Sequence, residues 1–327
     1  MPNIIDNTNS LQIGIQSVLA ETWRQQLPVF QEQQDLFLRR LPDTGQRTSE
    51  YPWKESLPFP VPWPYGKGRT YQSFKDRKIA ISIFPYELTI PFSGWDEEDD
   101  QLGDMRSHLQ ETARRMHQVP DKMIAEYLVG VADLNPNIKN AYDGVQMYSA
   151  VDGDGTDRFG VVGGNIIAGS GVSNTAQIID DLYTAQQRFI DFMDPSGESP
   201  IFSPDDCKFE NLVVIIPSAL NQAFREISKA ENLRVNVSNS VSESNTLVNS
   251  FEYRINPYLT DNSDYYITLK HQYWKPLIFR GPDNLRQIFA DFNNSDKARE
   301  YNEYAIHTDV RYGMGPWVPF TTLKVNN

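Results

Sequence analysis

The residues best placed to do chemistry are three aspartates in a glycine-rich stretch, Asp152, Asp154 and Asp157. Closely spaced carboxylates are typical of calcium loops, because Ca²⁺ takes several oxygen ligands. The spacing here departs from the D-x-[DN]-x-[DN]-G pattern, and no glutamate follows at the twelfth position. We therefore interpret this stretch as turns and predict no metal site.

Two glycine clusters, Gly163-Gly164 and Gly169-Ser170-Gly171, superficially resemble a phosphate-binding loop. The Lys-Ser/Thr pair that would follow such a loop is missing from both. The chain also has no G-x-S-x-G and no H-E-x-x-H motif. We predict no catalytic residue, no cofactor and no enzymatic activity.

The histidines and the single cysteine add no reactive constellation. His108 and His117 lie nine residues apart on a predicted helix, on roughly opposite sides, and we expect both to be solvated. His271 and His307 fall in predicted strands, away from any nucleophile motif. Cys207 excludes an internal disulfide or a Cys-rich zinc site, and we expect a small, half-buried apolar residue there.

Composition limits the classes of partner. The chain has 327 residues, a net charge of −13 and a mean hydropathy of −0.51. An acidic protein is poorly suited to general nucleic-acid binding, which depends on basic residues that displace counterions. No apolar run approaches the length of a membrane span, and the start of the chain lacks the pattern of a signal peptide. We expect synthesis in a cytoplasm and no membrane partner.

Residues 1–49 are predicted to form an arm. Helical spacing occurs in pieces around Trp23 and again around Phe37, with Pro28 between them. Because the arm is too short and interrupted to be a domain, its apolar residues are expected to dock on another surface.

Residues 51–92 are predicted to form a projecting hairpin. Four prolines alternate with four apolar residues: Pro58, Pro60, Pro62 and Pro64 with Phe59, Val61, Trp63 and Tyr65. Proline cannot donate to a strand ladder, so this segment needs another surface to cover it. Gly66-Lys67-Gly68 marks the turn. The alternation of the return strand slips by one residue at Phe84-Pro85, which predicts a bulge or bend.

A long helix should follow the hairpin. The acidic run 96–100 complements a helix N-terminus, and the helix should span about 30 residues. Pro120 should kink it or divide it. The apolar stripe consists of Leu102, Met105, Leu109, Met116, Val119, Met123, Tyr127 and Val131.

The next part of the chain indicates a small α/β unit. A helix is predicted at 175–192, and the continuous apolar run 212–217 is typical of a strand buried on both faces. Ser218 should cap a helix that runs through Lys229. Residues 234–250, rich in Ser and Asn, are predicted to be a mobile loop, and further strands follow it.

The order of these stretches resembles the Mu-like phage major head subunit. The similarity runs through YPW…GKGR, ELTIPF, DEEDDQLGDM, YDGVQMYS, LVVIIPSALNQAFREI, INPYL, YYITLKHQYWKPLIFR and RYGMGPW. It covers most of Tyr51 to Lys324, and it implies the tailed-phage and herpesvirus-type major capsid fold.

The resemblance implies an α+β fold with five parts. These are an N-terminal arm (1–49), an extended β-hairpin loop (50–94), a peripheral domain with a long spine helix (95–173), an axial α/β domain (174–264) and a return to the peripheral domain (265–327). Subunits of this kind form pentamers and hexamers of an icosahedral shell around double-stranded DNA. On this view the loop 234–250 lies near the capsomer axis, and the location is the virion, assembled in the host cytoplasm.

The resemblance also implies partners. The arm is too short for a fused scaffolding domain, so we expect a separate scaffolding protein, a portal and possible cement or decoration proteins. The acidic chain should touch packaged DNA only weakly and non-specifically. No Lys–Asn pair that matches the covalent crosslink of some relatives is identifiable.

The expected assembly contacts lie on the hairpin and the arm: Phe59, Val61, Trp63, Tyr65, Lys67, Arg69, Trp23 and Phe37. Deletion of residues 57–77 should leave a folded subunit that cannot assemble. Two other classes stay open: a carbohydrate- or protein-binding α/β module, and a carboxylate-dependent hydrolase.

Overall fold

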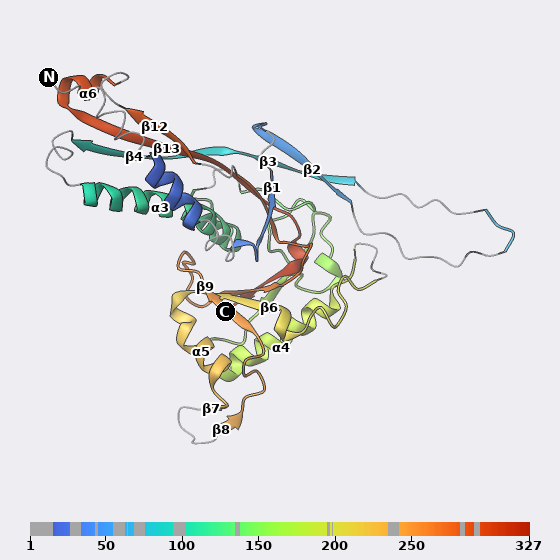
Figure 1. The fold of residues 1–327 in the computed structure, drawn as a ribbon. Coiled ribbons are helices and arrows are strands. Elements are labelled where there is room, and N and C mark those ends of the chain that lie inside the picture. Colours follow the sequence, from blue (N-terminus) through green and yellow to red (C-terminus); the bar gives the residue numbers. More distant parts are fainter. Residues whose placement is uncertain are drawn as a thin grey trace.

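The computed structural model describes residues 16–26, 34–42, 45–54, 63, 65–68, 76–93, 102–134, 138–194, 197, 199–234, 242–281, 285–290 and 295–327. Within these ranges the chain forms two five-stranded sheets and two two-stranded ribbons (Figure 1). Helix α3 lies along the first sheet, and α4 and α5 lie beside the second.

The first sheet is built on one long strand, β13 (Glu303–Pro316). Its order is β1 (Leu38–Leu41), β11 (Leu277–Arg280), β13 and β12 (Arg286–Ala290), and β4 (Phe84–Ser93) also pairs with β13. Segments from the first third and from the end of the chain therefore share one sheet.

The long helix α3 spans Leu102–Val129 and continues through Pro120, so the predicted division does not occur. Of the predicted stripe, Leu109, Met116, Met123 and Tyr127 are buried. Val131 is 61% exposed, contrary to the prediction, because Gly130 in the left-handed region (φ +83°) ends the helix before it. The acidic run 96–100, predicted to lie at the helix N-terminus, is outside the described residues.

The second sheet has the order β5 (Ile166–Ala168), β14 (Thr322–Asn326), β10 (Tyr265–Leu269), β6 (Leu212–Ile216) and β9 (Glu252–Ile255). Every residue of β6 is buried, which confirms the prediction for the apolar run. Strands β10 and β14 come from the segment 265–327, which also supplies β11, β12 and β13 of the first sheet. This segment therefore contributes strands to both sheets.

Two helices cover this second sheet. Helix α4 (Thr175–Asp191) begins where the Asn174 side chain accepts a hydrogen bond from the Ala176 amide. Helix α5 spans Asn221–Lys229, whereas Ser218 was predicted to cap it. Ser218 opens a 3₁₀ turn after Pro217, without a side-chain capping bond, so the α-helix starts three residues later.

Part of the predicted loop 234–250 is a strand. β8 (Ser242–Ser244) pairs antiparallel with β7 (Asn232–Arg234), and the Asn245 amide group donates to the carbonyls of Ile227 and Ala230. Residues 235–241, the rest of the proposed axial loop, lie outside the described residues. The remaining short elements are a helix over residues 16–26, α6 (Asp296–Tyr301) and the 3₁₀ turns Arg158–Gly160, Phe209–Asn211 and Pro319–Thr321.

The slip in the strand alternation predicted at Phe84-Pro85 marks the point where the chain leaves one sheet and joins another. β2 (Thr48–Lys54) and β3 (Asp76–Ser82) form a ribbon of their own, and the strand pattern breaks at Ile83 before β4 begins. Ile79 and Ile81 belong to the core under the second sheet, whereas Tyr86 and Ile90 pack on the core of the first. A one-residue slip turns the apolar face over, which suits a strand that passes from one core to the other.

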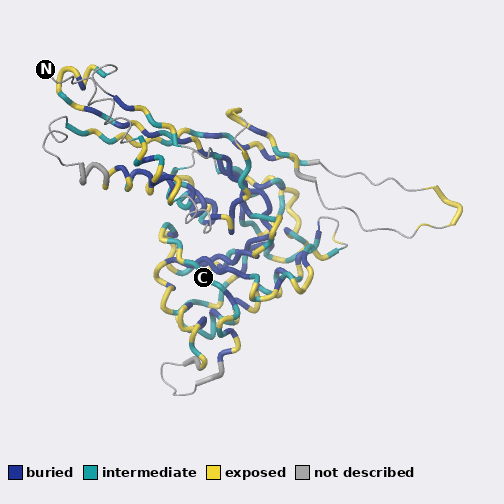
Figure 2. The backbone as a smooth tube through the Cα atoms, viewed as in Figure 1, coloured by how far each residue is buried: buried dark blue, intermediate teal, exposed yellow. Residues whose placement is uncertain are grey.

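The two cores follow the two sheets, and buried backbone concentrates along them (Figure 2). Among the described residues, no helix combines the length and apolar character that a membrane span requires.

Candidate assembly surfaces

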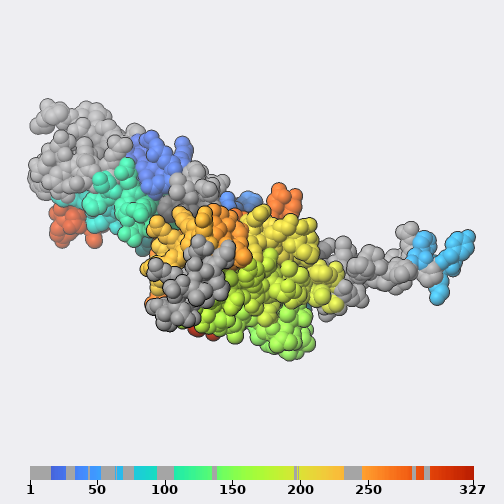
Figure 3. Space-filling view, turned by 90° about the horizontal axis from the view of Figure 1, so that it is seen from below, coloured from blue at the N-terminus to red at the C-terminus, as the bar shows by residue number. Residues whose placement is uncertain are grey.

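The tip of the hairpin exposes aromatic side chains. Trp63 is 63% exposed and Tyr65 is fully exposed, and residues 65–68 lie apart from the rest of the described chain (Figure 3). The turn is ordered locally, because Gly66 takes a positive φ (+83°) and the Trp63 indole Nε1 donates to the Lys67 carbonyl at 2.6 Å. Exposed aromatics at the end of a projection indicate a contact surface. Phe59, Val61 and Arg69 lie outside the described residues.

The base of the hairpin is fixed to the body. Ile81 in β3 is fully buried, and two glycines of β13 allow the strands to approach. A Cβ at Gly313 would lie 2.7 Å from the Ser82 carbonyl oxygen, and one at Gly315 would lie 2.9 Å from Ile81 Cγ1. The buried Arg280 guanidinium also donates to the Gln46 carbonyl at 3.2 Å. The tip therefore projects from a rigid foundation.

Trp23 and Phe37, two of the expected assembly contacts, are buried in their own subunit. They are 3% and 5% exposed, and both belong to the core under the first sheet. The Leu277 amide donates to the Phe37 carbonyl, and β1 continues from there as a parallel neighbour of β11. The expectation that these two side chains dock on a neighbour is corrected, because their own chain covers them.

His117 attaches the N-terminal segment to α3. It was predicted to be solvated, but it is buried. It is 4% exposed and stacks on Trp23 with ring centroids 3.6 Å apart. Its Nε2 lies 3.1 Å from the Trp23 carbonyl oxygen, so this nitrogen carries the proton. Desolvation lowers the pKa of His117 to about 4. The sequence did hold a signal, since His117 directly follows Met116 of the apolar stripe.

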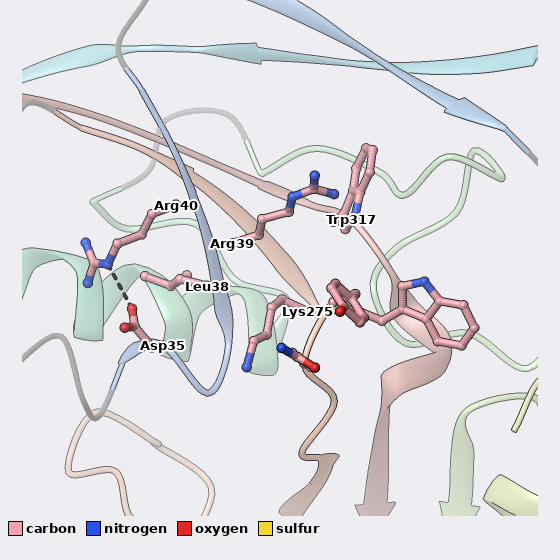
Figure 4. Close-up of a pocket in the computed structure, with 9 residues that line it drawn as sticks. Asp35, Leu38, Arg39, Arg40, Lys275 and Trp317 are labelled. Atoms are coloured by element: carbon pink, nitrogen blue, oxygen red, sulfur yellow. Dashed lines mark hydrogen bonds and ion pairs between the residues drawn. The ribbon is translucent and has the colours of Figure 1, made fainter. Parts of the chain in front are cut away.

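A basic hollow beside β1 was not predicted from the sequence. It encloses about 480 Å³ and is lined by Asp35, Leu38, Arg39, Arg40, Gln272, Tyr273, Trp274, Lys275 and Trp317 (Figure 4). We call it the basic hollow. Its residues come from three distant parts of the chain, so no local spacing marks it.

The cations of the basic hollow are not equally neutralised. Arg40 pairs with Asp35 at 2.9 Å. The Arg39 guanidinium lies over the Trp317 ring, 5.5 Å from its centroid. Burial lowers the pKa of Lys275, with Asp35 acting in the opposite direction. Among the described residues, neither Arg39 nor Lys275 has a carboxylate within ion-pair distance.

The aspartates and the cysteine considered for chemistry have structural surroundings. Asp152 accepts hydrogen bonds from the Asp154 and Thr156 amides, both at 3.0 Å, which closes a turn as predicted. In the described part of the chain, no cluster of three His, Cys, Asp or Glu side chains could hold a metal. Cys207 is buried, and this burial, with the Asp206 charge, raises its pKa to about 12.

A long helix along one sheet, a second α/β layer and a hairpin projecting from a fixed base define the architecture of a tailed-phage capsid subunit. Solved capsids share this fold. The chain superposes on the capsid of cyanophage P-SCSP1u (TM-score 0.52, 13% identity, 89% of this chain and 86% of that one), the mature capsid of bacteriophage PhiM1 (0.54, 11%, 90% and 86%) and the capsid of an empty GTA particle (0.55, 11%, 90% and 89%).

The sequence identifies the family. The family model for the Mu-like prophage major head subunit gpT matches residues 16–180. The chain belongs to this family, and it is a phage major capsid protein. A comparison with curated protein sequences gives no match.

Proposed function

We propose that this major capsid protein assembles with copies of itself into pentamers and hexamers that close into an icosahedral shell around double-stranded DNA. The observation that carries the proposal is the exposed tip with Trp63 and Tyr65, held away from the body on an anchored ribbon. Such a surface is incomplete in one subunit. A contact between two different patches closes into a ring when the rotation between neighbours permits.

The tip residues Trp63, Tyr65 and Lys67 are proposed to contact a neighbouring subunit, together with Phe59, Val61 and Arg69. The aromatic rings supply apolar area, and the cations suit the surface of a chain with a net charge of −13. Trp23 and Phe37 are removed from this set because they are buried in their own subunit.

The domain roles are likewise proposed. Residues 50–94 form the extended loop and the strand β4, by which it joins the first sheet, and this sheet with α3 forms the peripheral domain. The second sheet with α4 and α5 forms the axial domain, and the ribbon of β7 and β8 lies at its end (Figure 1). Residues 265–327 contribute strands to both domains.

The proposed partners follow from this role. A separate scaffolding protein, a portal and cement or decoration proteins would act with the shell, which assembles in the host cytoplasm. The acidic chain favours weak, non-specific contact with packaged DNA. We propose that the protein has no catalytic activity, in keeping with a family of structural subunits.

Expression of the full chain, alone and with a scaffolding protein, tests the proposal by size measurement and electron microscopy. Closed shells, or rings and tubes of capsomers, are the expected products. A protein that stays monomeric at all concentrations, with scaffold present, would overturn it.

A further inference from the structure

The basic hollow carries a charge opposite to that of most of the protein. The chain has 30 basic and 43 acidic residues. Even so, the described lining of this hollow contains three cations, Arg39, Arg40 and Lys275, and one carboxylate, Asp35, which Arg40 already binds. Its net charge is positive, and this favours an acidic occupant.

Aromatic side chains in the lining favour an occupant that also contains an aromatic ring. Tyr273 is 69% exposed at the hollow, and Trp274 and Trp317 also line it. The Trp274 ring is held in place, since it stacks on His271 with centroids 4.7 Å apart. A ligand that places an aromatic ring beside carboxylates would satisfy both the rings and the cations.

One segment of the chain has this composition. Residues 95–100 read WDEEDD, in which an indole directly precedes five consecutive carboxylates. No other stretch of the sequence has more than two consecutive acidic residues. The lengths of the flanking elements decide whether this run can reach the hollow of its own subunit.

The segment is tethered at both ends far from the Lys275 and Trp317 end of the hollow. Ser93 pairs with Glu303 at one end of β13, and Trp317 follows the other end, about 45 Å along the strand. Leu102 opens α3, about 37 Å along the helix from Tyr127, whose hydroxyl donates to the Met314 carbonyl. The loop between Ser93 and Leu102 reaches at most about 16 Å from its nearer end. The acidic run therefore cannot reach Trp317 of its own chain, or Lys275, whose neighbour Pro276 accepts a hydrogen bond from the Trp317 amide.

We propose that the basic hollow receives residues 95–100 of a second copy of the chain. The carboxylates pair with Arg39 and Lys275, and the Trp95 indole packs on Tyr273. The inference rests on the proposed self-assembly and adds a specific contact to it. Because the two patches differ, the contact runs head to tail and suits a ring of subunits.

Carbodiimide coupling in assembled particles tests the contact, because it joins a lysine amine to a carboxylate only when the two touch. Particles mixed from isotopically light and heavy subunits should give mixed-isotope peptides that link Lys275 to residues 96–100. The Lys275→Arg variant should assemble normally and lose this link. Coupling of Lys275 to other carboxylates, or no coupling while other lysines react, overturns the proposal. Coupling that appears only after packaged DNA is removed also overturns it, since nucleic acid would then occupy the hollow.

Charge reversal supplies the second measurement. Lys275→Glu should raise the protein concentration needed for assembly at least about tenfold, and Arg225→Glu, an exposed cation on α5, should not. The added substitutions Glu97→Lys and Glu98→Lys should restore assembly of the Lys275→Glu variant. Normal assembly of Lys275→Glu would sink this inference and leave the proposed function standing. Failure of the unaltered chain to assemble would overturn both.

Discussion

At the scale of residues, two titratable groups on α3, the buried His117 and the half-buried Asp121, contact the N-terminal segment. His117 and Asp121 lie one helical turn apart, and the Gln34 amide donates to the His117 carbonyl at 3.1 Å. Burial lowers the pKa of His117 to about 4 and raises that of Asp121 to about 6, against the opposing effects of Gln34 and Arg40 on Asp121. The two shifts act on stability with opposite signs.

The His117 contribution to the free energy of unfolding is complete above pH 6.5 and is lost as the pH falls toward 4, because the unfolded state then binds the extra proton. The Asp121 contribution is complete below pH 3.8 and is lost as the pH rises through about 6. Between pH 4 and 6 the two largely cancel.

We therefore predict opposite slopes in two variants of the unassembled subunit. The stability difference between the unaltered chain and His117→Phe should shrink as the pH falls from 6.5 to 4, by up to about 1.4 kcal/mol per pH unit. The corresponding difference for Asp121→Asn should grow over the same interval. Urea titrations at several pH values measure both. Slopes of the same sign would contradict the assignment.

The Arg158–Asp143 pair is a second determinant of stability. Arg158 is 1% exposed, and its Nε and Nη2 donate to the two oxygens of Asp143 at 2.7 and 3.0 Å. We predict that Arg158→Ala costs about 3–5 kcal/mol of unfolding free energy, because a buried carboxylate is left unpaired. Arg115→Ala, which breaks an exposed pair with Glu111 of the same 2.7 Å length, should cost less than about 1 kcal/mol. Equal costs in denaturant titrations would refute this.

Single-residue roles follow from the sequence where near neighbours decide them. Asp152 closes a turn with amides within four residues of it, as predicted. Cys207, expected to be half-buried, is fully buried in a core built from distant segments. Trp23 and Phe37 were misassigned to an interface, since the β1–β11 pairing that covers them joins residues far apart in the chain. The basic hollow was missed for the same reason.

At the scale of elements, local periodicity predicted α3, α4 and β6 well. Each has an apolar pattern that its own sequence repeats. The change of sheet at Ile83 was visible as a phase slip, but its meaning depends on which strands lie beside β3 and β4. The division of residues 265–327 between two sheets is also a matter of long-range pairing, which one sequence does not encode locally.

The junction of the hairpin and the body gives a prediction at this scale. Gly313→Val would place a side chain against the Ser82 carbonyl, where even a Cβ lies at 2.7 Å. We expect a loss of about 1–3 kcal/mol from overpacking and a reduced capacity to assemble. Gly68→Ala at the tip, where a Cβ meets nothing within 4 Å, should leave stability unchanged. Thermal unfolding and particle yield measure the two effects, and an unaffected Gly313→Val subunit would argue against a rigid base.

At the scale of the whole molecule, the body completes its own cores and the hairpin extends beyond them. The N-terminal segment, once expected to reach a neighbour, packs on its own α3 and β11. The ribbon from Thr48↔Ser82 to Lys54↔Asp76 is likewise complete without the tip. The tip and the basic hollow are therefore the two surfaces proposed to contact a neighbour.

The most direct test is electron microscopy of the unaltered chain beside a variant in which a short Gly-Ser link replaces residues 57–75. This deletion is shorter than 57–77, because Asp76 and Arg77 belong to β3. We predict shells or capsomers for the unaltered chain, and only single subunits with an intact cooperative melt for the variant. A variant that assembles as well as the unaltered chain would contradict the account, as would one that loses its cooperative melt.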